Sequence, residues 1–231
     1  CMARHIGIVG CSAEGAALCY RTICVEGAQI LGPHVHPEVS MHTPSLSHYV
    51  ACLESGDIEG VGKIMLESAE KLAGIGAEFL ICPDNTIHQA FEFVSSRSTL
   101  KWLHIADVVA YEAKSKGFHC AAVLGTKWLM ESQVYPKRLE AAGLAWQCPT
   151  EQERNELNRI IMEELVNSKF TPVAVEYHQR VIQRMKQSGC DVAILGCTEI
   201  PLLIDDSNSP LPTLDSTRLL ARAALHHAVL E

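Results

Sequence analysis

A cysteine and an aspartate stand at matching places in two similar segments of the chain. Cys197 follows the apolar segment that begins at Gly189, and Asp84 takes the same place after the segment that begins at Gly76. The two side chains are 113 positions apart (197 − 84), and the residues around them keep this offset. We interpret both segments as buried strands, whose C-terminal ends collect ligands in parallel α/β folds. We therefore predict that Asp84 and Cys197 face each other across a cleft.

Such a pair could move a proton on and off a carbon atom. One acid/base group on each face of a carbon next to a carboxylate would remove a proton on one side and return one on the other, which inverts the centre. Hydroxyl, amide and backbone N–H groups just beyond the strands would bind the carboxylate and stabilise the charge that develops. We predict Asp84 and Cys197 as the catalytic residues. The neighbours that we expect to bind substrate are Asn85, Thr86, Thr198 and Glu199.

The opening of the chain also recurs in its second half. Gly10 and Gly125 each end a short β-rich run, and they are 115 positions apart (125 − 10). We therefore predict an α/β fold with two pseudo-symmetric parallel-sheet α/β domains and the active site in the cleft between them. The first domain would hold residues 1–100 plus 213–231, so that the last helix returns to it, and the second would hold residues 101–212.

The composition excludes several classes of function. The chain has 231 residues, of which 48% are hydrophobic and 20% charged, as expected for a globular protein with a large core. A net charge of −8 and the lack of a Lys/Arg cluster argue against nucleic acid or an anionic membrane as partner. No apolar stretch approaches the roughly 18–20 residues of a membrane span, and we expect no signal or transit peptide.

The ten cysteines do not indicate a disulfide framework or a zinc site. No C-x-x-C pair occurs, and most of the cysteines lie in apolar or helical runs, where a free thiol acts as a small hydrophobe. This usage fits a reducing compartment such as the cytoplasm. His34 and His36 have the spacing of two ligands on one face of a strand, but we find no complete ligand set around them. We predict no metal and no cofactor.

Two motifs carry a resemblance to a known group of enzymes. The run Gly196–Glu199, with Pro201-Leu202-Leu203 after it, resembles the second catalytic motif of the aspartate/glutamate racemase superfamily, in its aspartate-racemase-like branch. Asn85-Thr86 and His88 resemble the first motif, Cys-Asn-Thr-x-His. The resemblance covers most of the chain. It implies a PLP-independent isomerase, an amino-acid racemase that binds a small carboxylate substrate, needs no cofactor and forms a homodimer.

Three departures from the superfamily pattern concern the predicted site. Asp84 stands where the first catalytic cysteine is expected, and we predict it as the replacement base, with Cys82 in the core. The glycine-rich first loop is altered to Cys11–Gly15. The arginine expected near Pro44–His48 to hold a side-chain carboxylate is absent, while Lys169 resembles the second basic residue. The complete set of predicted substrate-binding residues is Ser12, Asn85, Thr86, Thr126, Lys169, Thr198 and Glu199.

An aspartate and a cysteine form an unequal pair of bases. Reference pKa values are about 3.9 for Asp and about 8.5 for Cys, so the resting pair at neutral pH is a carboxylate and a thiol. Proton abstraction by Cys197 needs a protonated Asp84 together with a Cys197 thiolate. Reaching that state from the resting pair costs roughly 6 kcal/mol at the reference pKa values. A racemase that works in both directions must therefore raise the pKa of Asp84 and lower that of Cys197.

Other functions on the same plan stay open at this point. Superfamily relatives with one active cysteine decarboxylate disubstituted malonates, and others isomerise maleate or racemise hydantoins. A protein of this fold could also bind a small carboxylate without turnover, because a fold does not fix a function. Deuterium incorporation at Cα without loss of CO₂ would separate a racemase from a decarboxylase, and turnover would separate an enzyme from a binding protein.

Overall fold

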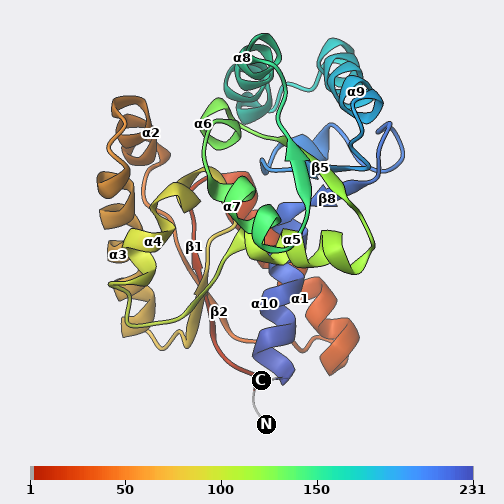
Figure 1. Ribbon diagram of the computed structural model, residues 1–231. Coiled ribbons are helices and arrows are strands. Elements are labelled where there is room, and N and C mark those ends of the chain that lie inside the picture. The colour runs from red at the N-terminus through yellow and green to blue at the C-terminus, as the bar shows by residue number, and fades with distance from the viewer. Residues whose placement is uncertain (1–2, 231) are drawn as a thin grey trace. The chain divides into compact units, whose positions relative to one another are not determined.

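The computed structural model describes residues 3–230, and the chain divides into two compact units (Figure 1). Unit 1 comprises Cys1–Val108 and Thr217–Glu231, and unit 2 comprises Val109–Ser216. Each unit holds one four-stranded sheet in which every strand pair is parallel. The predicted α/β class with two parallel-sheet domains is confirmed.

Unit 1 has the strand order β2-β1-β3-β4, formed by Val39–His42, Ile6–Val9, Phe79–Ile81 and Trp102–Leu103. Its helical elements are α1 (Ala13–Leu31), α2 (Leu46–Ser55), α3 (Ile58–Gly74), the 3₁₀ turn η1 (Thr86–Ala90), α4 (Phe91–Ser95), the start of α5 (Ile105–Ser115) and nearly all of α10 (Ser216–Leu230). Apolar residues of α10 pack into the core formed by β1 and β3.

Unit 2 has the strand order β6-β5-β7-β8, formed by Ala145–Gln147, Cys120–Leu124, Val192–Leu195 and Thr213–Asp215. Its helical elements are the rest of α5, α6 (Lys127–Met130), α7 (Val134–Ala141), α8 (Glu151–Arg159), the π turn η2 (Ile160–Glu164), the 3₁₀ turns η3 (Leu165–Asn167) and η4 (Ile200–Leu202), and α9 (Pro172–Gln187). No helix within residues 3–230 is both long and apolar enough to cross a membrane.

The two sheets have the same topology, which confirms the internal repeat. In each unit the first strand in sequence lies between the second and the third, and the fourth strand pairs with the third. β3 and β7 therefore occupy equivalent places. Asp84 follows β3 and Cys197 follows β7, so the two residues correspond in the fold as well as in the sequence.

Two predicted helices have a different form in the structure. The sequence suggests one helix over 130–142, but it is broken between α6 and α7 because the Ser132 hydroxyl bonds the Leu129 carbonyl oxygen at 2.7 Å and accepts from the Val134 N–H at 3.3 Å. The sequence also predicts a helix from Thr150 to about Val166, with Thr150 as its N-cap. In the structure this helix begins there, with a capping box between Thr150 and Glu153. Beyond Arg159 it changes to the π turn and then to a 3₁₀ turn.

Two glycines allow the ends of β5 and β7 to lie close together. A Cβ atom on Gly196 would lie 2.6 Å from the Leu124 carbonyl oxygen, and one on Gly125 would lie 2.9 Å from the Gly196 carbonyl oxygen. The Gly196 N–H donates to the Leu124 carbonyl oxygen at 2.8 Å, which extends the pairing beyond β7. A side chain at Gly196 would push apart the strand ends directly before Cys197.

We expect Gly196→Ala to lower the free energy of unfolding by about 1–3 kcal/mol, because the added methyl group overpacks a site bounded by backbone. Gly74→Ala is the matched control, since Gly74 ends α3 and a Cβ atom there meets nothing within 4 Å. Urea denaturation of both variants measures the difference. Equal midpoints for the two variants would contradict this account of the strand ends.

Candidate active site

Asp84 lies directly beyond the buried strand β3, on the turn that leads into η1. Its Oδ1 accepts from the Ile87 N–H at 3.4 Å, and its carbonyl oxygen accepts from His88 at 2.6 Å. Asn85 and Thr86, the predicted substrate-binding neighbours, are only 2% and 6% exposed. The turn is thus held by both the side chain and the backbone of Asp84.

Cys82 lies in the core, as its apolar setting predicted. It is fully buried, and burial followed by the Asp84 carboxylate raises the pKa of its thiol. Its Sγ–H points at the Asp84 carbonyl oxygen at 3.7 Å. Because the thiol resists ionisation there, Cys82 is a poor substitute for the cysteine that the first motif lacks.

Tyr49 is a buried polar residue of unit 1 that no pattern in the sequence marks. Its side chain on α2 is fully buried, and its hydroxyl makes no hydrogen bond to any described residue. Burial is the main cause that raises the pKa of Tyr49. Smaller contributions come from the Cys82 and Cys11 thiols and the Asp84 carboxylate. Tyr49 is therefore a neutral phenol near the groups at the ends of β1 and β3. Only the packing of α2 in the folded chain reveals it.

The thiol of Cys197 is hydrogen-bonded to a buried carboxylate. Cys197 Sγ donates to Glu199 Oε2 at 2.9 Å, and the Thr198 hydroxyl donates to the same oxygen at 2.8 Å. The three side chains are only 3–7% exposed. The turn after β7 therefore brings together all three residues predicted there and gives the thiol a partner that can accept its proton.

Ser12 and Thr126 hold equivalent positions in the two units. Ser12 caps α1 by accepting from the Gly15 N–H at 3.3 Å, and Thr126 caps α6 by accepting from the Leu129 N–H at 3.2 Å. Each residue follows the strand that pairs with the strand before Asp84 or Cys197. Each hydroxyl thus has a structural role at the carboxyl ends of the strands of its own sheet, where the predicted catalytic residue of that unit also lies.

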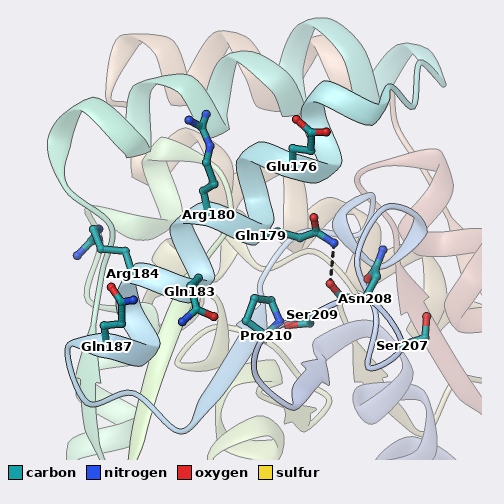
Figure 2. A pocket seen from close by; sticks show the side chains of 10 residues that line it. All are labelled: Glu176, Gln179, Arg180, Gln183, Arg184, Gln187, Ser207, Asn208, Ser209 and Pro210. Carbon is teal, nitrogen blue, oxygen red and sulfur yellow. Dashed lines mark hydrogen bonds between the residues drawn. The ribbon is translucent and has the colours of Figure 1, made fainter.

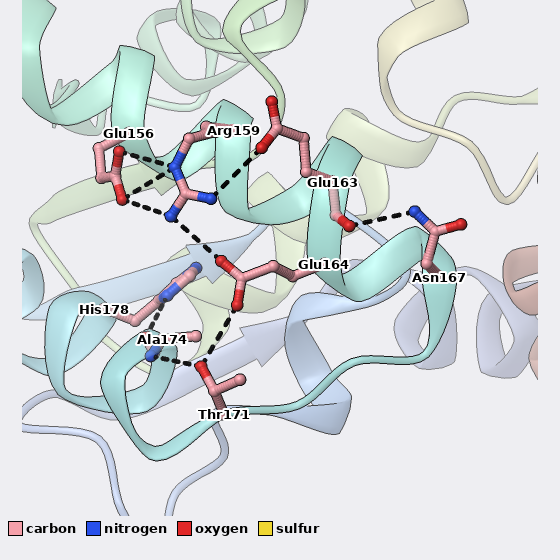
Figure 3. Close-up of polar contacts among 8 residues, drawn as sticks. All are labelled: Glu156, Arg159, Glu163, Glu164, Asn167, Thr171, Ala174 and His178. Carbon is pink, nitrogen blue, oxygen red and sulfur yellow. Dashed lines mark hydrogen bonds and ion pairs between the residues drawn. The ribbon is translucent and has the colours of Figure 1, made fainter.

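Lys169 lies on an exposed turn that Glu164 anchors. The Lys169 N–H donates to the Glu164 carbonyl oxygen at 2.9 Å. The Glu164 carboxylate accepts from the Thr171 hydroxyl at 3.3 Å and pairs with Arg159 at 3.1 Å (Figure 3). These contacts fix the backbone on both sides of Lys169 and leave its side chain exposed.

The surface of unit 2 also has a polar groove of about 770 Å³ between α9 and the loop 207–210 (Figure 2). Gln179 donates to the Asn208 carbonyl oxygen at 2.8 Å within it. None of the predicted site residues lines this groove. Its chemistry is that of a solvated surface, so we do not assign the substrate to it.

Within residues 3–230, no three His, Cys, Asp or Glu side chains gather closely enough to hold a metal ion. The cysteines of this range are free thiols, including Cys120 and Cys190, whose sulfur atoms lie 3.6 Å apart.

Comparison with known proteins assigns the segments around Asp84 and Cys197 to one family. The model of the Asp/Glu/Hydantoin racemase family matches residues 7–224, a range that contains both motifs. The chain belongs to this family. Its relatives are racemases, which are isomerases, and the expectation of an isomerase is confirmed.

Individual members of the racemase family match most of the chain. The broad specificity amino-acid racemase RacX of Bacillus subtilis (strain 168) is 24% identical over 176 residues, which is 73% of each chain. A Yersinia pestis protein assigned to the Asp/Glu racemases has a structure with a TM-score of 0.90 and 29% identity, over 98% of this chain and 99% of that one. For an aspartate racemase homologue from Pyrococcus horikoshii OT3 the TM-score is 0.81 and the identity 30%, over 97% and 99%.

His178 is a buried imidazole on α9, and one of its ring nitrogens has no hydrogen-bond partner among the described residues. Its Nδ1–H donates to the Ala174 carbonyl oxygen at 2.8 Å, whereas Nε2 has no partner among the described residues (Figure 3). Burial lowers the pKa of His178, while the bond to Ala174 and the Glu164 carboxylate act in the opposite direction. The folded protein therefore holds this ring neutral.

A lowered pKa makes His178 a source of acid instability. The unfolded chain binds a proton on this histidine near pH 6.5, whereas the folded chain resists it. The contribution of neutral His178 to the free energy of unfolding is therefore complete above pH 6.5 and is lost as the pH falls below that value. We expect stability to fall by up to about 1.4 kcal/mol per pH unit in that window from this group. His178→Leu should make the urea midpoint depend less on pH between pH 7 and pH 5. His48→Leu, at an exposed position, should leave that pH dependence unchanged. An unchanged slope in His178→Leu would disprove the assignment.

Proposed function

We propose that this chain racemises free α-amino acids by exchanging the Cα proton, with Asp84 and Cys197 as the two bases and without a cofactor. The observation that carries the proposal is the 2.9 Å hydrogen bond from the Cys197 thiol to the buried Glu199 carboxylate. It lies at the carboxyl end of β7, and Asp84 lies at the equivalent end of β3. Membership of the racemase family supports the reaction class.

The bond to Glu199 supplies what a cysteine base needs. A thiol must lose its proton before it can remove one from carbon. Glu199 can accept that proton at Oε2 while Thr198 holds the carboxylate in place. In the reverse direction the same oxygen returns the proton to sulfur. We therefore extend the predicted role of Glu199 from substrate binding to proton transfer with Cys197.

Asp84 serves the other face of Cα in this proposal. Its Oδ1 accepts the Ile87 N–H at 3.4 Å, which is long enough to be a weak bond. A carboxylate can accept a proton at either oxygen, so Asp84 can take the Cα proton in this proposal. The substrate carboxylate would be bound by the hydroxyl and amide groups beside the two bases, and Lys169 would offer a cation to it or to the side chain.

The proposal includes a homodimer, as the family resemblance implies, that works in the cytoplasm, as the cysteine usage indicates. The first test is an NMR panel of amino acids and their enantiomers in heavy water, which follows loss of the α-proton. Deuterium at Cα together with the opposite enantiomer supports the proposal. Release of CO₂ would assign a decarboxylase, and binding in a thermal melt without any exchange would assign a binding protein.

We expect Asp84→Asn and Cys197→Ala each to lower racemisation by about 10²–10⁴-fold, the range for loss of a general acid/base group. Each variant should still exchange the α-proton of the one enantiomer that faces its remaining base. Chiral chromatography measures racemisation, and NMR in heavy water measures exchange. The matched control is Cys24→Ala, which removes a partly exposed thiol of α1 and should keep full activity. Full racemisation by either single variant would rule out two bases.

Glu199→Gln should separate the two half-reactions. The amide keeps the shape of the side chain and cannot take the proton from Cys197. We expect α-proton exchange to fall by about 10²-fold for the enantiomer that Cys197 deprotonates and by less than about threefold for the one that Asp84 deprotonates. The enantiomer assignments come from the Asp84→Asn and Cys197→Ala variants. An equal loss for both enantiomers would show that Glu199 only binds substrate.

A further inference from the structure

His88 lies between two backbone groups that belong to different parts of unit 1. It sits in η1, four residues after Asp84, and its ring is 3% exposed. Its Nδ1 lies 2.6 Å from the Asp84 carbonyl oxygen. A carbonyl oxygen only accepts hydrogen bonds, so Nδ1 carries the proton.

The other ring nitrogen faces a donor. His88 Nε2 lies 3.3 Å from the backbone nitrogen of Ile105, the first residue of α5, and accepts its N–H. Nε2 therefore carries no proton. The two contacts together define a neutral imidazole with hydrogen on Nδ1.

Aromatic contacts prevent the ring from leaving this position. Phe91 is stacked on His88 with the ring centres 5.9 Å apart and the planes at 7°, and His104 meets it edge-on at 4.7 Å. His104 also packs on Phe91 at 4.5 Å, and its Nδ1 accepts from the Ala106 N–H at 3.0 Å. The orientation of the His88 ring is thus set from several sides.

We infer that His88 is the positioning residue that sets the place of Asp84 for proton transfer, through its Nδ1–H bond to the Asp84 backbone. The inference rests on the proposed function, in which Asp84 is a base. The bond fixes the carbonyl side of Asp84, while the Ile87 N–H meets its carboxylate at 3.4 Å. His88 is not itself a base in this scheme, because backbone groups engage both of its nitrogens.

The ring has two functional ends, and two amide side chains can each replace one of them. In His88→Asn the side-chain NH₂ takes the place of Nδ1 and can still donate to the Asp84 carbonyl oxygen. In His88→Gln the side-chain oxygen reaches the place of Nε2 and can still accept from Ile105. His88→Ala removes both ends, and exposed His48, changed to Asn and to Gln, is the control pair.

The expected result is a crossed pattern. A displacement of about 1 Å at a reacting group can cost about 10²-fold in rate, so we expect His88→Gln and His88→Ala to lose about 10²-fold in kcat with KM within about threefold. His88→Asn should lose less than about tenfold. Hydrogen exchange of the Ile105 amide should show the reverse order: slow in the wild type and in His88→Gln, and faster in His88→Asn and His88→Ala.

Nitrogen-15 NMR of histidine-labelled protein reads the tautomer directly. We expect a protonated Nδ1 and a bare Nε2 for His88 in the wild type. The opposite tautomer, or equal behaviour of the Asn and Gln variants in both kcat and amide exchange, would overturn the inference. Absence of α-proton exchange by the wild type with every amino acid would refute the proposed function instead, and the tautomer and the Ile105 amide would still test the two contacts of His88.

Discussion

The structure depends on the parallel pairing of β3 and of β7, each with its neighbours in its own sheet. Each has a partner on both sides, so that Ile81 pairs with Ile8 and Leu103, and Leu195 pairs with Leu124 and Asp215. A parallel sheet delivers the carboxyl end of every strand to the same edge. The residue that follows a central strand is therefore placed by a hydrogen-bonded ladder rather than by a long loop. The candidate base of each unit has this location, and precise acid/base chemistry needs such a support.

Much of this arrangement could be predicted because its signals are local or repeated. Continuous apolar runs identified β3 and β7, and their common offset identified Asp84 and Cys197 as equivalents. The capping box at Thr150 was also predictable, since it lies within four residues. In these cases the interactions that form the element are between neighbours in the sequence.

The features that sequence reasoning missed depend on the folded packing. The π turn at Ile160–Glu164 breaks a helical pattern that the sequence continues. The bond from Cys197 to Glu199 requires the turn geometry after β7. The His88 ring joins the Asp84 carbonyl oxygen to the Ile105 N–H, which is 17 residues from His88 in the sequence. Tyr49 and His178 are fully buried polar side chains on helices, and no spacing rule marks them. Periodicity identifies the buried face of a helix, but it does not identify a polar group that the core must accommodate.

The surroundings of Cys197 and of Asp84 differ in how each base could hold its proton. Cys197 has a carboxylate at 2.9 Å that can take the thiol proton, whereas Asp84 has His88 and Cys82 on its carbonyl oxygen and the Ile87 N–H on its carboxylate. In the proposed reaction Asp84 keeps the proton that it removes until it returns it or solvent exchanges it. A thiol hydrogen-bonded to a carboxylate on one side and a carboxylate base on the other make the two enzyme forms unequal in energy.

This inequality has a limit that follows from the reaction itself. Two enantiomers have the same free energy in water, so the equilibrium constant of racemisation is one and kcat/KM must be equal in the two directions, whatever the bases are. The mismatch between Asp84 and Cys197 can therefore appear only as kcat and KM values that differ between the two enantiomers by the same factor, or in α-proton exchange that is not coupled to inversion. An apparent preference for one enantiomer at saturating substrate would reflect which base holds the proton in the resting enzyme, and not a one-way catalyst. Because Glu199 acts on the thiol alone, it is the group through which this chain could change kcat for one enantiomer relative to the other while kcat/KM stays equal for both.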